Sequence, residues 1–399
     1  MKFLIAPDKF KGSLSAEEVS ENIAFGIRDV IQNAEIEIAP MADGGEGTAE
    51  AICKARGGKW VTCSAHGPLG DPIEVSYVWL EENASAVMEM SEAAGMRRLK
   101  NTVRDVLHAN TLGVGEMLLD AARRGAREII IGLGGSATND GGLGMARALG
   151  FRFLGEGESE LTDVASLVRL TRIIPPSSQS SPFLSRGERR TRSGSEGKGS
   201  GRAKPEEGHL SQTFDVASSR IIAAVDVRNP LLGPNGATYT FGPQKGASPE
   251  QLELLERSLT HLADTVARNL SYDFRNESGA GAAGGLGFGL MSFCDAKVQP
   301  GFEVVAEAVG LEQKIKEVDV IITGEGKLDN QTLEGKTPAG VAELAHKFGK
   351  RVFAIVGRAE ASSSARNLFN GVYELAGPIP QAKELLRERA RELATMLKM

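Results

Sequence analysis

Five separated segments of this 399-residue sequence combine glycine with lysine, carboxylate or amide side chains. Glycine lets backbone N–H groups crowd around an anion, lysine neutralises phosphate, and carboxylates bind Mg²⁺. Because the combination recurs so often, the sequence predicts a phosphorylated ligand, and phosphoryl transfer is the working hypothesis. The segments are PDKFKGS (7–13), ADGGEGT (42–48), GLGGSATNDGG (132–142), FGPQKGA (241–247) and TGEGKLDNQT (323–332).

The segment 132–142 is the most specific of the five. It follows the apolar run EIIIG and opens a helical pattern, so successive N–H groups and the helix dipole would face an anion. A tight strand–helix turn would need the glycines, but it would not need Asn139 and Asp140. The pattern therefore favours a binding loop over a purely structural turn.

Carboxylates stand at several predicted strand ends. Asp43, Glu325 and Asp329 lie beside glycines, and Asp226 ends an apolar strand at 220–226. Carboxylates in such places can be solvated helix caps, because Asp and Glu favour helix starts. Their recurrence favours Mg²⁺ ligation or a general base, so Asp43, Asp226, Glu325 and Asp329 are the candidate metal ligands.

Lysines also occur within the glycine segments. A lone lysine is usually solvated, and only the loop context makes Lys9, Lys11 and Lys245 candidates for phosphate binding. GKT at 335–337 resembles the end of a P-loop, but Asn330 stands where that motif needs glycine. Lys336, near a predicted helix start, could still meet a phosphate.

Gly279, Gly281 and Gly284 match the spacing GxGxxG. The polar segment before them makes a poor first strand for a dinucleotide-binding unit, so the match is weak by itself. Close backbone packing and a phosphate nest explain the glycines equally well.

Composition narrows the range of partners. The net charge is −6 and the pI is about 5.6, so no global charge attracts nucleic acid or an anionic membrane. The three cysteines form no CxxC pair, and no apolar stretch approaches the roughly 20 residues that cross a bilayer. We therefore expect a cytoplasmic protein that binds neither nucleic acid nor membrane.

The predicted elements alternate as in a parallel α/β sheet. Strands at 2–6 and 35–40 each lead into a glycine segment and then a helix, and ligands of such sheets lie beyond the carboxyl ends of the strands. Residues 59–90 instead predict antiparallel strands. The α/β pattern returns at strand 128–132 and again from about residue 280, where a helix is expected at 303–316.

These patterns predict an α/β protein of two α/β domains. Residues 1–66 and 282–399 would form a discontinuous parallel-sheet domain, and residues 67–281 an inserted mixed α/β domain. The stretch 175–212 is rich in Ser, Gly and Arg and almost free of apolar residues, so we expect it to be a disordered insertion without a role in the mechanism.

As a set, the motifs resemble those of the glycerate kinase family, bacterial type I class. The matching stretches are PDKFKGSLSA, PMADGGEGT, GLGGSATNDGG, DVRNPLLGPNGA, FGPQKGA, GAGAAGGLGFG and TGEGKLDNQTLEGKTPAGVA, spread from residue 7 to about 342. The resemblance implies ATP-dependent phosphorylation of D-glycerate with Mg²⁺, in a cleft between two α/β domains. It also implies that the discontinuous domain is Rossmann- or flavodoxin-like. It favours 2-phosphoglycerate over 3-phosphoglycerate as the product.

Residue chemistry within these motifs suggests roles. Phosphoryl transfer needs charge neutralisation and alignment more than covalent help. Asp43 and Asp226 would face the metal or the substrate hydroxyl, one of them as general base, while Lys11 and Lys245 would steady the transferring group. The expected substrate- and phosphate-binding residues are Asp8, Lys9, Ser13, Gly44, Gly45, Gly134, Gly135, Ser136, Asn139, Asp140, Asn229, Gly281, Gly284 and Lys336.

Three alternatives remain open at this point. The same loops could serve a kinase of another small hydroxy or sugar acid. The GxGxxG match could belong to a dinucleotide-dependent oxidoreductase, and the protein could be a nucleotide-binding regulatory module without catalysis. The oligomeric state does not follow from the sequence.

Overall fold

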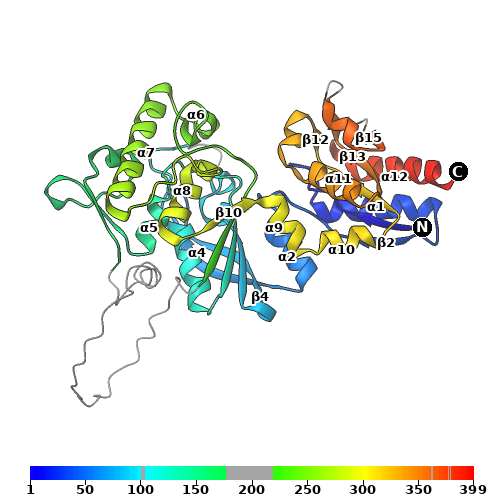
Figure 1. Cartoon of the computed structure of the whole chain (residues 1–399), viewed down its shortest axis with the longest axis horizontal. Coiled ribbons are helices and arrows are strands. Elements are labelled where there is room, and N and C mark those ends of the chain that lie inside the picture. The colour runs from blue at the N-terminus through cyan, green and yellow to red at the C-terminus, as the bar shows by residue number, and fades with distance from the viewer. Residues whose placement is uncertain (100–103, 177–218, 361–362, 376, 378) are drawn as a thin grey trace, which may run out of the picture.

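The computed structural model describes residues 1–99, 104–176, 219–360, 363–375, 377 and 379–399. They form two α/β lobes, and both chain ends lie in the same lobe (Figure 1). The predicted insertion at 175–212 lies outside the described residues from position 177 onward. No helix in the described part of the chain is long and apolar enough to cross a membrane.

The lobe that contains the chain ends is built on a five-stranded parallel sheet in the order β15-β13-β11-β1-β2. Phe3 of β1 pairs with Val320 of β11, so the N-terminal and C-terminal segments share one sheet. This confirms the predicted discontinuous parallel sheet. The strands are β1 (Lys2–Ile5), β2 (Glu35–Ile38), β11 (Val320–Thr323), β13 (Arg351–Val356) and β15 (Gly371–Glu374).

Helices cover both faces of this sheet. α1 (Ala16–Val30) and α12 (Ala382–Lys398) share one buried cluster with strand side chains such as Phe3 and Ile355. α1 begins at the predicted capping box, in which Ser15 Oγ accepts from the Glu18 N–H at 3.1 Å.

The predicted single helix at 303–316 is two helices, α9 (Gly301–Ala308) and α10 (Leu311–Lys316). Gly310 adopts a left-handed φ of +66° between them, which ends α9. Together with α11 (Thr337–Lys347), they cover the other face of the parallel sheet.

The inserted lobe is built on a mixed sheet in the order β10-β9-β6-β5-β4-β3. The first four strands in this order are parallel, and β4 and β3 are antiparallel, as the sequence predicted for residues 59–90. The strands are β3 (Lys59–His66), β4 (Pro72–Leu80), β5 (Ser85–Glu89), β6 (Glu128–Gly132), β9 (Arg220–Val225) and β10 (Lys297–Pro300).

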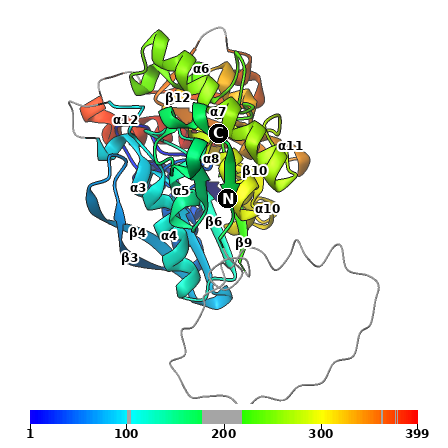
Figure 2. The ribbon, with the colours of Figure 1, turned by 90° about the vertical axis from the view of Figure 1, so that its left-hand side faces the viewer.

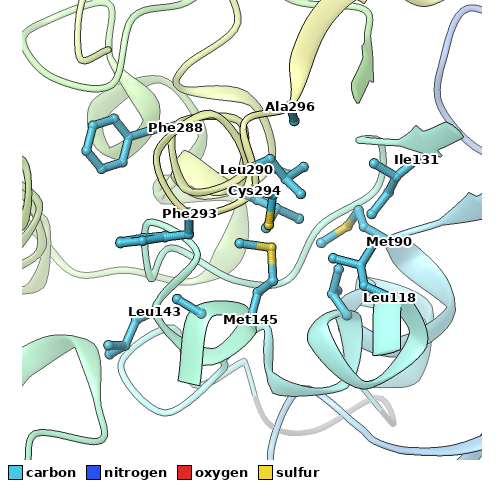
Figure 3. Packing of buried hydrophobic residues seen from close by; sticks show 14 of the residues in the cluster. Met90, Leu118, Ile131, Leu143, Met145, Phe288, Leu290, Phe293, Cys294 and Ala296 are labelled. Carbon is cyan, nitrogen blue, oxygen red and sulfur yellow. The ribbon is translucent and has the colours of Figure 1, made fainter. Parts of the chain in front are cut away.

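One face of the mixed sheet is covered by helices of its own lobe, as Figure 2 shows for α4, α5 and α8. Side chains such as Leu118, Met145, Phe293 and Ile131 interlock in this core (Figure 3). The helices are α4 (Leu112–Arg123), α5 (Leu143–Ala148), α7 (Pro249–Leu270) and α8 (Ala282–Cys294).

A second core joins the two lobes. The opposite face of the mixed sheet packs against α2 (Thr48–Arg56) and α9, and this cluster continues into the parallel sheet. Ile52, Ile130 and Val305 are buried members of that cluster. The lobes are therefore connected by packed apolar side chains as well as by the chain.

The strands of the mixed sheet extend beyond the expected insertion of 67–281. β3 pairs along its whole length with β4, from Lys59 opposite Trp79 to His66 opposite Pro72, and β10 pairs with β9. Strand pairing is thus a stronger guide to the limits of this unit than the turn at residue 67. We propose that the inserted domain begins near residue 58 and ends near residue 301.

Short elements complete the described chain. They are α3 (Ser91–Ala94), α6 (Ala237–Phe241), β7 (Arg152–Leu154), β8 (Arg172–Ile174), β12 (Lys327–Leu328), β14 (Arg358–Ala359), and the 3-10 helices η1 (Glu81–Asn83), η2 (Met96–Arg98), η3 (Glu156–Glu158), η4 (Val164–Arg169), η7 (Pro243–Lys245), η8 (Asn330–Glu334), η9 (Ser364–Leu368) and η10 (Ile379–Gln381).

Candidate functional site

The loops that follow β1, β2 and β11 meet the loops that follow β6 and β9. The Asp8 N–H donates to the Gly324 carbonyl oxygen at 2.8 Å, which joins the loops after β1 and β11. A Cβ on Gly134 would lie 2.5 Å from the Cα of Gly45, which is closer than a side chain can approach. The glycines therefore let the loops of the two lobes pack backbone against backbone.

Four carboxylates from these loops form an electrostatic cluster. The charge on Asp43, in the loop after β2, acts on Asp8, Asp226 and Glu325. Asp8 and Glu325 follow strands of the parallel sheet, whereas Asp226 directly follows β9 of the mixed sheet. The cluster thus brings together acidic residues from both sheets.

Burial and mutual repulsion raise the pKa of three of these carboxyl groups. Burial, followed by the charge on Asp43, raises the pKa of Asp8 to about 7 and that of Asp226 to about 6. Asp226 is exposed at the wall of an open cavity, and the protein around that cavity limits the hydration of its carboxyl group. Burial also raises the pKa of Glu325 to about 7, with smaller contributions from Asp329 and Asp43. Such values are near those that suit a proton acceptor at neutral pH.

Hydroxyl groups hold the two buried members of the cluster. Thr337 Oγ1, at the start of α11, donates to Asp8 Oδ2 at 2.8 Å. Thr332 Oγ1 donates to Glu325 Oε1 at 2.7 Å. These bonds fix the orientation of both carboxylates.

Lysines partly offset the negative charge. The charge on Lys9 opposes the pKa rise of Asp8 and Asp226, and that on Lys336 opposes the rise of Asp226 and Glu325. Lys9 also donates through Nζ to the Glu46 carbonyl oxygen. Both predicted lysines are therefore close enough to act on the carboxylate cluster.

Two adjoining cavities lie beside the cluster. The first, of about 390 Å³, is lined by the loop after β1 and the start of α1, including Asp8, Lys9 and Ser13, and by Trp60 of the mixed sheet. The second, of about 590 Å³, is lined by Asp226 and Lys245 and by the loop after β6. The two cavities share Lys11, Glu46 and Arg97 as lining residues.

The loop after β6 divides into an exposed part and a buried part. Gly134, Gly135 and Ser136 line the second cavity. Asn139 is buried and donates through Nδ2 to Thr238 Oγ1 at 3.1 Å. The first part is thus positioned to meet a ligand, whereas the second belongs to the interior of the lobe.

Asp140, expected to bind substrate or phosphate, instead connects elements inside the lobe. Its carboxylate accepts hydrogen bonds from the N–H groups of Thr111, Gly142 and Gly144 and from Thr111 Oγ1. Burial raises its pKa, and these bonds oppose the rise. With four donors and 1 % exposure, this carboxylate holds the starts of α4 and α5 together.

Lys245 is a buried cation at the wall of the second cavity. Only 2 % of it is exposed, and Nζ donates to the Thr138 carbonyl oxygen at 2.7 Å. Burial lowers its pKa to about 7, and the charge on Asp140 limits the fall. An anionic ligand in this cavity would favour the charged form.

The glycines of the GxGxxG segment are packed against backbone atoms of neighbouring segments. A Cβ on Gly281 would lie 2.2 Å from the Pro230 carbonyl oxygen, and one on Gly284 would lie 1.9 Å from that of Thr138. The GxGxxG glycines therefore allow close packing, and a phosphate nest is not needed to explain them.

Two other predicted site residues bind neighbouring protein groups. Asn229 donates through Nδ2 to the Asn235 carbonyl oxygen at 2.7 Å. Asp329, a candidate metal ligand, pairs with Lys327 at 2.9 Å.

Gly44 is packed between the lobes. It has a φ of +97°, and a Cβ there would lie 2.8 Å from the Cα of Gly301 and 3.0 Å from the carbonyl carbon of Ala224. Only glycine suits both this conformation and this contact. The residue thus sets the path of the loop that carries Asp43.

The sequence analysis missed Glu89 and Arg97. Glu89 Oε1, at the end of β5, accepts from the N–H groups of Gly47 and Ala49 at 2.8 and 3.2 Å, and so binds the start of α2. Its place at a strand end is the signal that identified the other carboxylates. Arg97 lies outside every glycine segment, and nothing in its local sequence identifies it.

The donor set fits a metal ion that arrives with a nucleotide. Among the described residues no group of three His, Cys, Asp or Glu side chains is arranged to hold a metal by itself. Mg²⁺ commonly uses one or two carboxylates, with phosphates and water completing its shell. The repulsion that Asp43 exerts on Asp8 and Asp226 is the charge pattern that a divalent cation would relieve.

The site combines glycine loops, lysines and clustered carboxylates beside two joined cavities. These are the components of a small-molecule phosphotransferase. Residues 3–184 and 202–399 match the glycerate kinase family. The chain is 36 % identical to the glycerate kinase of Bacillus subtilis (strain 168), over all of this chain and 98 % of that protein. It is 38 % identical to the glycerate 2-kinase of Escherichia coli (strain K12), over 90 % of this chain and 85 % of that protein.

A solved structure agrees with these sequence matches. The crystal structure of a Salmonella typhimurium LT2 protein, described as a candidate glycerate kinase 2, superposes with a TM-score of 0.81 at 36 % identity. The match covers all of this chain and 98 % of that one. The chain belongs to the glycerate kinase family. Its activity is that of a glycerate kinase, which implies ATP as the co-substrate.

Proposed function

We propose that the protein transfers the γ-phosphoryl group of MgATP to the 2-hydroxyl of D-glycerate between its two lobes. The observation that carries this proposal is the carboxylate cluster of Asp8, Asp43 and Asp226 beside two joined cavities. Lysines and backbone N–H groups of both lobes surround these cavities. Phosphoryl transfer needs this combination of positive charge and alignment.

Asp226 is the proposed proton acceptor. It lines the second cavity, and its pKa of about 6 suits proton removal from a hydroxyl at neutral pH. The oxygen of the 2-hydroxyl forms a bond to the γ-phosphorus while the bond from that phosphorus to the β–γ bridging oxygen breaks. The hydroxyl proton passes to Asp226, and ADP and 2-phosphoglycerate are the products.

The charged groups around the cluster have proposed binding roles. Asp43 would hold Mg²⁺, which would neutralise phosphate charge, and Lys11 would steady the phosphates from the shared wall of the cavities. Lys245, with Gly135 and Ser136, would bind an anionic group in the second cavity. Glu325 lies close enough to affect the charge of the site, whereas Asp329 is already paired with Lys327.

The choice of the 2-hydroxyl is supported by the Escherichia coli relative, whose name is glycerate 2-kinase. The test couples the reaction of D-glycerate and MgATP directly to enolase, without phosphoglycerate mutase. Because enolase consumes 2-phosphoglycerate only, an immediate signal is expected. A signal that depends on added mutase would instead assign the 3-hydroxyl.

A panel of small hydroxy acids and sugar acids tests the choice of acceptor. D-glycerate should give the highest kcat/KM for ADP release. A higher value for another acid would overturn the choice of D-glycerate while leaving the kinase chemistry in place. ADP release without any phosphorylated acid would contradict the transfer itself.

A further inference from the structure

Arg97 lies where the two cavities meet. It is in η2 of the inserted lobe, and its side chain lines both cavities together with Lys11 and Glu46. Arg98, its neighbour in the same turn, is not among the residues that line either cavity. The two arginines therefore differ in access to the site although they are adjacent in sequence.

The backbone before Arg97 is attached to the anion-binding loop. The Met96 N–H donates to the Gly135 carbonyl oxygen at 2.9 Å, and Gly95 forms a β-bridge with Ser136. The position of this turn is thus fixed relative to the N–H groups that line the second cavity. A change in the loop would also move Arg97.

The guanidinium of Arg97 is bound by groups of its own lobe and lies near a carboxylate of the other lobe. Its Nε donates to the Ser91 carbonyl oxygen at 3.2 Å, and Nη2 forms an ion pair with Glu92. Nη1 lies 3.8 Å from Glu46 Oε1 of the other lobe, beyond hydrogen-bond distance. This nitrogen can therefore donate to an anion between the cavities while Nε and Nη2 keep their present partners.

In phosphoryl transfer, donor and acceptor oxygens lie on opposite sides of the transferred group. If each cavity holds one substrate, that group lies at their common wall, whichever substrate each cavity takes. We propose that Arg97 contacts the phosphoryl group during its transfer and stabilises the charge on its oxygens. This inference rests on the proposed kinase reaction and adds a residue to it.

A planar guanidinium suits this task better than an ammonium group. It can keep one nitrogen on Glu92 while another meets a phosphoryl oxygen, whereas a lysine offers a single point of charge. Arginines that contact a transferring phosphoryl group commonly change the rate by about 10³-fold or more. Arg97→Lys should therefore restore little of the lost turnover.

The test compares Arg97→Ala and Arg97→Lys with Arg98→Ala. Arg98 Nη2 also pairs with Glu92, at 2.8 Å, so Arg98→Ala reproduces the loss of that ion pair outside the cavities. We expect kcat to fall about 10³-fold in Arg97→Ala, with little change in either KM, and to stay near the wild-type value in Arg98→Ala. Added guanidinium ion should restore part of the Arg97→Ala activity, which a purely structural role would not predict.

The outcomes separate this inference from the proposed function. A wild-type protein that does not phosphorylate D-glycerate would overturn the function itself. An active wild type, with an Arg97→Ala kcat reduced less than about tenfold, would overturn the role of Arg97 alone. If Arg97→Ala fails to fold, the Arg97→Lys variant provides the test. Full activity of Arg97→Lys would contradict the proposal. A large loss in its kcat, with an unchanged melting profile, would support it.

Discussion

Asp43 affects three other carboxyl groups while lying between residues of both sheets. Its negative charge raises the pKa of Asp8, Asp226 and Glu325, which means that the free protein contains unfavourable repulsion at this point. A ligand-binding protein can carry such a cost because a cation relieves it. The repulsion makes the role of Asp43 testable by stability and by activity.

Asp43→Asn should lower kcat by at least ~10²-fold. It should also raise the thermal stability of the ligand-free protein at pH 7 to 8. The reason is that Asp8 has a pKa of about 7 in the folded protein against 3.8 unfolded, so stability from this group falls as the pH rises between these values. Removing the charge of Asp43 lowers the folded pKa and reduces that loss.

The measurements for Asp43→Asn are steady-state kinetics and thermal melting of the free protein. Asp29→Asn is the matched control, because Asp29 pairs with Arg391 on the outside of α1. It should change neither quantity appreciably. Near-normal turnover of a folded Asp43→Asn protein would eliminate the proposed Mg²⁺-binding role of Asp43.

Lys245→Met should remove a pH dependence of stability. The folded pKa of Lys245 is about 7, below its ordinary 10.5, so the folded protein binds fewer protons than the unfolded chain between these values. Stability of the ligand-free protein therefore rises with pH through this range. The melting temperature of the wild type should rise with pH, by roughly 2–4 °C for each kcal/mol gained in the free energy of unfolding. The melting temperature of Lys245→Met should not show this rise.

Melting curves at a series of pH values check this prediction, and phosphate supplies a second test. An anion beside Lys245 should favour its charged form and weaken the pH dependence of the wild type. Lys245→Met should not respond to phosphate in this way. Equal pH profiles for the two free proteins would show that Lys245 titrates at its ordinary value.

At the level of elements, the site depends on close contact between the loops after β2 and β6. Gly45 and Gly134 face each other with no room for a Cβ on the second. Glu89 binds the start of α2 from β5, so the loop that carries Asp43 is fixed at both of its ends. Backbone contact and one buried carboxylate thus position the loop more than its own side chains do.

Gly134→Ala should destabilise the protein by about 1–3 kcal/mol, because its Cβ would lie 2.5 Å from the Gly45 Cα. Gly45→Ala tests the same contact from the other side, where the nearest atom to the new Cβ is Asp43 Oδ1 at 3.3 Å. The Gly45→Ala substitution should therefore lower the free energy of unfolding much less than Gly134→Ala does. Chemical denaturation measures both, and equal stability losses would contradict the predicted asymmetry.

For the whole molecule, the shared core is the main constraint on how the lobes move. α2 and α9 bury apolar side chains against both sheets, so opening the cleft widely would expose part of this cluster to water. We therefore expect small adjustments of the loops around the cavities when ligands bind.

Deletion of residues 185–201 should leave kcat and both KM values unchanged within error. These residues are absent from the match to the glycerate kinase family, and their composition predicts no packed structure. Steady-state kinetics with D-glycerate and ATP checks the prediction. A large fall in kcat with a preserved melting temperature would assign a function to this segment.

Most of the secondary elements, the parallel and antiparallel regions and the motifs of the site could be predicted from the amino-acid sequence alone. Local patterns carry this information, as in the capping box of Ser15 and Glu18 and in the glycines beside Asp43. The same local signals did not separate a ligand contact from an internal contact at Asp140 or at the GxGxxG glycines. A carboxylate or glycine in a loop has the same sequence signature whether it meets a ligand or a neighbouring segment.

The tertiary structure decided which of these residues face the cavities. It separated Ser136, at the cavity wall, from Asp140, buried four positions later, and it brought Arg97 to the site without any local signal. It also extended the mixed sheet to β3 and β10 through strand pairing. Burial and long-range contacts depend on segments far apart in the chain, and for this reason spacing along the sequence could not supply them.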